Sequence, residues 1–410
     1  MIQKMIDFIK RTNFFWIMVL WLFIKFDILA QNFYTEDNLL RDSTFQHKTA
    51  AILNQIYGFQ FANAQKLLVD LKRQYPEHPA VPFLYGLMYF WIIDTYHPDK
   101  SRDALFLSYM DTVLALTTKM KQPPKTVNVE RAFFEFSALA FKARLYALRD
   151  QYMKAINLCI KSLPAFQTGL KYKKYSPEFL FSSGMYLYYV KWYGETKPIT
   201  RPFLSLFPPG NKELGIQEME KCVSDNNLAS AESAVFLMFI YLDEKKYTDA
   251  LRHGEHLSNL FPYNTFIALL YGKSLLMAGE YSKAVALFSK ARIAFEKTVN
   301  CYTTLIPISK NLWTSQVMQK MLYYGAISIY KQENDYTEAL DWLEKSAKIT
   351  EMLKNGENGM NALIAFQKGI CYEQLQKKTE AIQHYRLALA ADNNAEIKKQ
   401  AESAIQRLEK

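Results

Sequence analysis

The chain has 410 residues, half of them hydrophobic, and only 14 glycines and 14 prolines. This composition argues for helix almost throughout, and the absence of alternating strand patterns with hairpin turns excludes an all-β protein. The formal net charge of +10 is spread along the chain without a dense basic stripe. That distribution argues against a nucleic-acid partner and is compatible with acidic partners or peripheral association with an anionic membrane face.

Residues 1–30 are predicted to be a secretory signal peptide. A basic segment precedes an unbroken apolar run over residues 14–24, and Ala30 is a small residue at the expected cut. The run is shorter than the about 20 apolar residues that cross a bilayer, and no later stretch predicts a membrane span. Because the ending Leu-Ala-Gln resembles Gram-negative signal peptides, we expect an exported chain in the periplasm or at the outer membrane. Lys25 and Asp27 keep an uncleaved inner-membrane anchor as the alternative.

The first half of the mature chain is predicted to consist of irregular helix pairs. Several first helices carry a small residue between aromatics, as Gly86 and Gly184 do, and prolines separate the pairs. The predicted helices, in chain order, are 45–57, 61–71, one around Gly86, 101–120, a pair from about 127 that ends before Pro164, and 176–193.

A proline-rich segment over residues 197–210 cannot stay helical for long, because proline removes a backbone donor and restricts the preceding residue. Asn211 then has the character of an N-cap for the next helix. We therefore expect a divergent array over 31–196 and a more regular array over 211–394. A polar helix within 395–410 is predicted to cap the second array.

The second half shows a repeat period. Ala250 and Ala284 are 34 residues apart, whereas Ala284 and Ala339 are 55 apart and Ala339 and Ala381 are 42 apart. The 55-residue interval predicts an insertion around residues 292–316, as extended helices with a loop.

This pattern resembles the tetratricopeptide repeat (TPR), a helix-turn-helix unit of about 34 residues. In it, aromatic and small residues recur at fixed spacing. The best copies are Tyr271, Gly272, Leu275, Tyr281, Ala284, Phe288 and Ala291, and Gly369, Tyr372, Ala381, Tyr385 and Ala388. The resemblance implies an all-α, TPR-like α-solenoid, a right-handed superhelix of stacked antiparallel helix pairs. The small residues are expected at the closest approach of the two helices.

In TPR proteins the first helix of each pair lines a concave groove, so positions counted from the small residue predict which side chains face inward. Most are apolar, which suits an extended peptide or a partner helix that docks through apolar anchors. The alternative interpretation is that they are core. The candidate groove residues are Phe83, Leu87, Trp91, Phe181, Met185, Tyr188, Phe239, Leu242, Lys273, Tyr330 and Phe366.

We expect no enzyme and no cofactor. Lys273 and Ser274 follow Gly272 as in a phosphate-binding loop, but Ile267 stands where that loop needs glycine. His253 and His256 could supply two metal ligands, but no third is evident, so we predict no metal site.

The expected function is therefore a non-catalytic scaffold that binds a protein or peptide partner. Chaperone clamping is not implied, because only Lys273 fits the basic groove positions of those TPR domains. The alternatives are a glycan or small-ligand binder associated with the outer membrane, and an enzyme with a metal at His253 and His256. The four cysteines, Cys159, Cys222, Cys301 and Cys371, are interpreted as buried thiols, with one or two disulfides left open.

Overall fold

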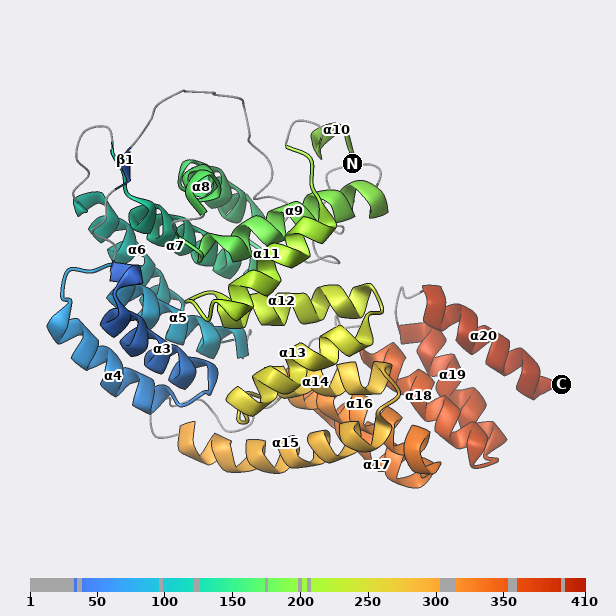
Figure 1. The fold of residues 1–410 in the computed structure, drawn as a ribbon. Coiled ribbons are helices and arrows are strands. Elements are labelled where there is room, and N and C mark those ends of the chain that lie inside the picture. The colour runs from blue at the N-terminus through green and yellow to red at the C-terminus, as the bar shows by residue number, and fades with distance from the viewer. Residues whose placement is uncertain are drawn as a thin grey trace. The chain divides into compact units, whose positions relative to one another are not determined.

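The computed structural model describes residues 33–34, 39–95, 99–120, 126–173, 176–197, 201–204, 208–302, 315–352, 360–391 and 395–410. Within these ranges the chain is helical apart from its turns and two short strands, β1 (Phe33–Tyr34) and β2 (Thr126–Val127), which pair in parallel (Figure 1). The all-α prediction is confirmed. The predicted signal peptide lies outside the described residues, and none of the described helices is long and apolar enough to cross a membrane.

The chain divides into two compact units, Met1–Leu237 and Met238–Lys410. The first unit contains η1 (Leu39–Arg41), α3 (Ser43–Tyr57), α4 (Phe61–Gln74), α5 (Ala80–Thr95), α6 (Asp103–Lys119), α7 (Val129–Leu148), α8 (Tyr152–Tyr172), α9 (Phe179–Thr196), α10 (Arg201–Leu204) and α11 (Lys212–Ser224). The division falls within α12 (Ser230–Asp243).

The second unit contains the more regular helices. They are α13 (Tyr247–Leu260), α14 (Thr265–Met277), α15 (Tyr281–Tyr302), α16 (Ser315–Glu333), α17 (Tyr336–Met352), α18 (Met360–Gln374), α19 (Lys378–Ala391) and α20 (Ala395–Glu409).

Within each unit, neighbouring hairpins pack on one another, as two examples from each unit show. In the first unit α3 contacts both α4 and α5, and α5 contacts both α6 and α7. In the second unit α14 contacts α15 and α16, and α18 contacts α19 and α20. Contacts between alternate helices place the first helices of successive hairpins side by side, as the TPR resemblance implies.

The turns inside the hairpins repeat one backbone conformation. Lys245 and Gln376 have φ of 58° and 60°, and Gly279 has φ of 81°. At each turn the next backbone N–H reaches back five residues, as from Glu280 to the Leu275 carbonyl at 2.9 Å. This is the Schellman closure of a helix C-terminus, which reverses the chain tightly. Lys245 and Gly279 are one 34-residue repeat apart.

Small residues lie at the helix contacts, as predicted. A Cβ added to Gly272 would lie 2.3 Å from the Phe288 ring, and one added to Gly369 would lie 2.6 Å from the Tyr385 ring. Ala284, another predicted small position, is fully buried. Replacing hydrogen by a methyl group at these positions would force the two helices apart.

The backbones of α9 and α11 approach each other closely at two glycines. A Cβ on Gly184 would lie 2.6 Å from the Gly215 carbonyl oxygen, and a Cβ on Gly215 would lie 2.7 Å from the Gly184 carbonyl oxygen. Both obstacles are backbone atoms, so they cannot swing aside as a flexible side chain would.

The proline-rich segment lies within the first unit. Asn211 caps α11, because its side chain accepts a hydrogen bond from Leu214 N at 2.9 Å, and its own N–H donates to the Leu187 carbonyl of α9 at 2.9 Å. This confirms the predicted cap. The division of the array at residues 197–210 stays a prediction.

Two local expectations differ from the structure or fall outside it. Pro164 does not end the preceding helix, because α8 continues through it to Tyr172. In the predicted insertion, α15 does extend to Tyr302, and α16 begins at Ser315; the loop between them lies outside the described residues.

The three cysteines whose side chains are described, Cys159, Cys222 and Cys371, are free and buried. Burial raises the pKa of each thiol to about 12. A buried thiol held in its neutral form is a packing group rather than a nucleophile.

We expect Gly184→Ala to destabilise the protein by about 1–3 kcal/mol, because the added methyl group separates α9 from α11. The matched control is Gly194→Ala near the end of the same helix, where the nearest non-local atom is 3.6 Å from the new Cβ. The control should be neutral or stabilising by roughly 0.5 kcal/mol, as alanine is the better helix former. Urea unfolding of both variants measures the difference, and equal midpoints would contradict the assigned contact.

We also expect the three described thiols to resist alkylation. At pH 8, maleimide labelling of Cys159, Cys222 and Cys371 should be at least roughly 1,000-fold slower in the native protein than in the denatured one, because few thiolates form at a pKa far above the solution pH. Peptide mass mapping assigns each site separately. Rapid native labelling, or a disulfide among the three, would overturn this description.

Candidate functional site

The first helices of the first unit enclose a cavity of about 70 Å³. We call it the first-helix pocket. Its walls come from α3, α5, α7, α9 and α12, together with the turns that precede α9 and α12. The lining residues are Tyr57, Phe83, Leu87, Phe133, Phe136, Ser137, Ala140, Phe141, Arg144, Glu178, Phe181, Ser182, Leu228, Ala229 and Glu232.

The pocket is largely apolar because aromatic residues of α3, α5, α7 and α9 line it. Phe83 of α5 makes edge-to-face contacts with Phe133 and Phe141 of α7, at ring-centroid distances of 6.3 Å and 5.9 Å. Such pairs add packing energy beyond the area they bury. The aromatic walls therefore hold the first helices of adjacent hairpins together while leaving a cavity between them.

Arg144 is the basic group of this pocket. Its guanidinium lies 3.7 Å from Asp94 and 3.8 Å from Glu232, and it stacks over the Phe90 ring at 4.5 Å from the centroid. Arginine suits this position because its flat cation can pack on a ring face and pair with two carboxylates at once.

Glu232 is the least satisfied acid of the pocket. The residue is only 8% exposed, and its carboxylate hydrogen-bonds the Tyr57 hydroxyl. Its second oxygen, Oε1, is buried and has no hydrogen-bond partner among the described residues. Burial raises the pKa of Glu232, and Asp94 adds to this, while Arg144 and the Tyr57 hydrogen bond oppose it.

Glu178 is a second buried acid in the pocket wall. The Ser176 hydroxyl donates to its Oε2 at 2.7 Å. Burial still raises the pKa of Glu178 above the usual range for a carboxyl group, against the lowering effect of that hydrogen bond. The pocket therefore holds two carboxyl groups whose charged forms lack full compensation.

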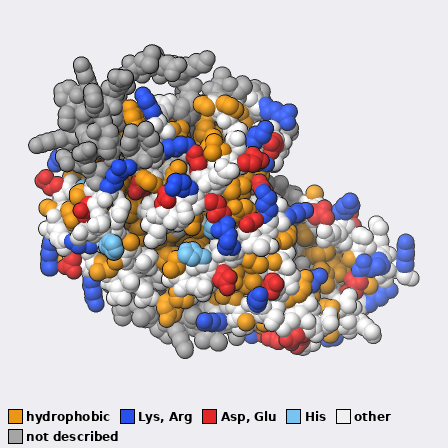
Figure 2. All heavy atoms as spheres, in the orientation of Figure 1, with side chains coloured by type: hydrophobic (Ala, Val, Ile, Leu, Met, Phe, Trp, Pro, Cys, Tyr) orange, Lys and Arg blue, Asp and Glu red, His pale blue; other side chains and the backbone are white. Residues whose placement is uncertain are grey.

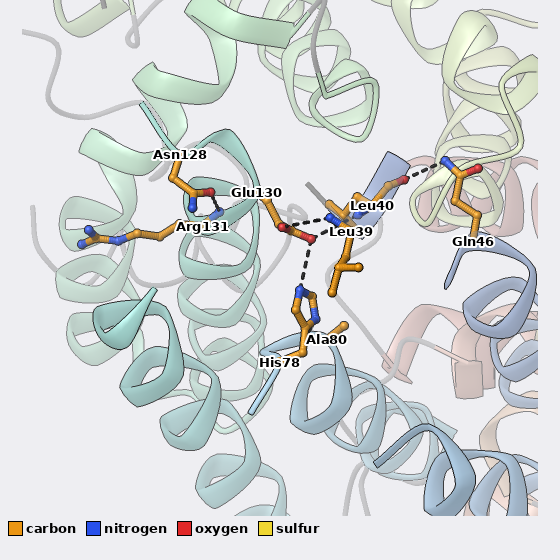
Figure 3. Close-up of polar contacts among 8 residues, drawn as sticks. All are labelled: Leu39, Leu40, Gln46, His78, Ala80, Asn128, Glu130 and Arg131. Atoms are coloured by element: carbon orange, nitrogen blue, oxygen red, sulfur yellow. Dashed lines mark hydrogen bonds and ion pairs between the residues drawn. The ribbon is translucent and has the colours of Figure 1, made fainter. Parts of the chain in front are cut away.

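A third buried acid, Glu130, links separate segments of the chain through hydrogen bonds (Figure 3). It accepts hydrogen bonds from Leu39 N at 3.3 Å and Leu40 N at 3.1 Å, and His78 Nε2 lies 3.2 Å from its Oε1. Because His78 Nδ1 accepts from Ala80 N at 3.3 Å, Nε2 is the protonated nitrogen that donates. Glu130 thereby ties the segment before α3 to the first turn of α7.

The predicted groove residues occupy two kinds of environment. Seven are buried: Phe83, Leu87, Trp91, Met185, Tyr188, Tyr330 and Phe366. Phe181, Phe239, Leu242 and Lys273 are half-buried. Three of the eleven, Phe83, Leu87 and Phe181, meet in the first-helix pocket. A partner-binding role for the whole set stays a prediction.

Lys273 lies in the second unit, on α14. Burial lowers the pKa of Lys273, and its ammonium lies 5.8 Å from the centroid of the Tyr324 ring of α16. Phe366 belongs to a different recess of the second unit, formed by α18, α19 and α20.

The two histidines considered as metal ligands have different surroundings. His253 is buried and stacks on the Tyr241 ring at 6.0 Å, whereas His256 is exposed. In the described ranges, no group of three or more His, Cys, Asp or Glu side chains could hold a metal ion.

Sequence reasoning missed the charged residues of the pocket. Arg144 and Glu232 lie at the margins of apolar stretches in first helices, and that contrast was the available signal. The pairing was not accessible, because Arg144 and Glu232 lie on helices of different hairpins. On the face shown in Figure 2, basic and acidic side chains are interspersed among apolar ones.

Comparison with known protein families finds a match in the second unit. The tetratricopeptide repeat family model matches residues 320–394, which contain most of α16 and the helices through α19. No curated protein sequence matches this chain significantly.

Three of the solved structures that the chain matches have the following similarity to it. The human IFIT1 dimer with PPP-AAAA is 14% identical, with coverage of 82% of this chain and 70% of that chain and a TM-score of 0.37. The P58(IPK) TPR domain is 12% identical, with coverage of 88% and 97% and a TM-score of 0.23. The APC/C hetero-tetramer Cut9–Hcn1 is 15% identical, with coverage of 85% and 80% and a TM-score of 0.26.

The raised pKa of Glu232 predicts a pH-dependent effect of Glu232→Gln. The pKa of this acid is about 4.5 in the unfolded chain and higher in the folded protein. The folded state therefore becomes less stable relative to the unfolded state as the pH rises from about 4.5 through the folded pKa. The glutamine variant resembles the protonated acid, so its stability relative to the natural protein should be unchanged near pH 4 and should increase toward pH 7. Thermal unfolding across this range measures the difference. A variant that loses relative stability as pH rises would show that Arg144 dominates over burial.

Proposed function

The chain carries tetratricopeptide repeats, and on that premise we propose that it is a protein-interaction scaffold whose partner docks on the first helices of the first unit. The observation that carries this proposal is the first-helix pocket, where five first helices converge on one apolar cavity. Binding sites between proteins concentrate their energy in a few anchor side chains that fill such pockets.

The size of the cavity favours a side-chain anchor. Its volume of about 70 Å³ is roughly half that of an engineered cavity of about 150 Å³ that holds benzene. Sites for drug-sized ligands are larger, about 300–1,000 Å³. A single side chain of a partner peptide or helix therefore fits the pocket better than a free ligand such as a sugar.

The remaining parts of this proposal come from the sequence. Residues 1–30 have the character of a secretory signal, which supports export to the periplasm or the outer membrane. We propose a non-catalytic role, because the sequence carries no recognised catalytic motif and Arg144 and Glu232 are paired with each other.

The test is site-specific photo-crosslinking in the cells that produce the protein. A benzophenone amino acid at Ser182, in the pocket wall, should form a covalent adduct with one dominant protein. The same amino acid at Met153, which is 69% exposed on the second helix α8, is the matched control and should not form it.

A pocket-filling variant separates docking from chance proximity. Ala140→Phe places a ring into the cavity and should lower the Ser182 adduct by roughly tenfold or more, as loss of one anchor does. Circular dichroism confirms that the variant is folded. Equal adducts from Ser182 and Met153, or an adduct that Ala140→Phe leaves unchanged, would reject docking at this pocket.

A further inference from the structure

The walls of the first-helix pocket combine aromatic rings with acidic groups. Six of its lining residues are aromatic, from α3, α5, α7 and α9. They are Tyr57, Phe83, Phe133, Phe136, Phe141 and Phe181. Aromatic faces carry partial negative charge and attract cations, most strongly where water is excluded.

The unpartnered oxygen of Glu232 requires a donor. Oε1 is buried without a hydrogen-bond partner among the described residues, in a side chain that lines the cavity. Leaving a buried acceptor unsatisfied costs about 1–3 kcal/mol, and more when the group is charged. An entirely apolar occupant would leave this oxygen without a donor, whereas a donor that carries positive charge would relieve that cost.

The charge balance of the pocket also favours a cation. Arg144 is the basic lining residue, and its guanidinium is already placed between Asp94 and Glu232 and over the Phe90 ring. Glu178 adds a further carboxyl group to the wall. A cationic occupant would favour the charged forms of these two carboxyl groups, which burial disfavours.

The available space limits the cation to a small one. A guanidinium needs several donors satisfied in one plane, whereas an alkylammonium is a compact charge on a slender apolar stem. The stem can lie along the aromatic walls while the ammonium reaches Glu232, in the manner of side chains that bury their methylene groups.

We propose that the first-helix pocket recognises an alkylammonium group, namely the side chain of a lysine presented by the partner. This inference rests on the proposed function, because it names the anchor that the partner inserts. The lysine ammonium donates a hydrogen bond to Glu232 Oε1, and its methylene chain packs between the rings of Phe83 and Phe181.

The test compares two small probes on the full chain. Nα-acetyl-lysine N-methylamide carries the ammonium, and Nα-acetyl-norleucine N-methylamide has the same stem without it. Titration by ligand-observed NMR at pH 7 should give a dissociation constant about tenfold lower for the lysine probe, as expected for one charge-assisted hydrogen bond.

Glu232→Gln provides the decisive variant. It keeps the shape of the side chain but removes its charge, so the ratio of the two dissociation constants should fall to about one. Glu213→Gln, an exposed acid on α11, is the matched control and should keep the tenfold ratio. Equal affinities for the two probes in the natural protein would overturn the proposal, and so would a preference that survives Glu232→Gln.

Failure of this inference can be told from failure of the proposed function. If the Ser182 adduct forms and Ala140→Phe abolishes it while the two probes bind equally, a partner docks through an apolar anchor, and only the lysine assignment falls. If neither probe binds at roughly 10 mM, the pocket does not recognise an ammonium and the lysine assignment falls as well.

Discussion

The close approach of the two helices in each hairpin is the constraint on which the structure depends. At Gly184 and Gly215 two backbones meet without an intervening side chain, and at Gly272 and Gly369 an aromatic ring of the second helix takes the space of the missing side chain. Each contact sets the spacing of one hairpin. Because the next hairpin packs on both helices, a change in the distance between the helices of one hairpin would also displace the neighbouring hairpins.

This spacing brings the first helices side by side. Their aromatic residues cannot be covered within a single hairpin, so they pack across neighbouring ones, as Phe83 does against Phe133 and Phe141. Large rigid rings fill this layer incompletely, and the first-helix pocket is the remaining space. The pocket is thus a product of the same packing that stabilises the stack.

Charged groups inside this layer are compensated to different extents. Both carboxylate oxygens of Glu130 have hydrogen-bond partners, namely two backbone N–H groups and His78. Arg144 is shared between two acids, whereas Glu232 keeps one oxygen without a partner. A buried polar group that its own protein leaves unsatisfied costs stability.

The sequence by itself determined the helices, the hairpins and their small-residue contacts, because these follow from local periodicity and from residue volume. Gly272 lies against Phe288, and Asn211 caps α11, as the residue patterns predict. Tertiary structure alone decided that Phe83, Leu87 and Phe181 line one pocket and that Arg144 pairs with Glu232, 88 residues away. The helical periodicity of the sequence predicts on which face of its helix a side chain lies. Only the packing of separate hairpins determines which faces come into contact and what space remains between them.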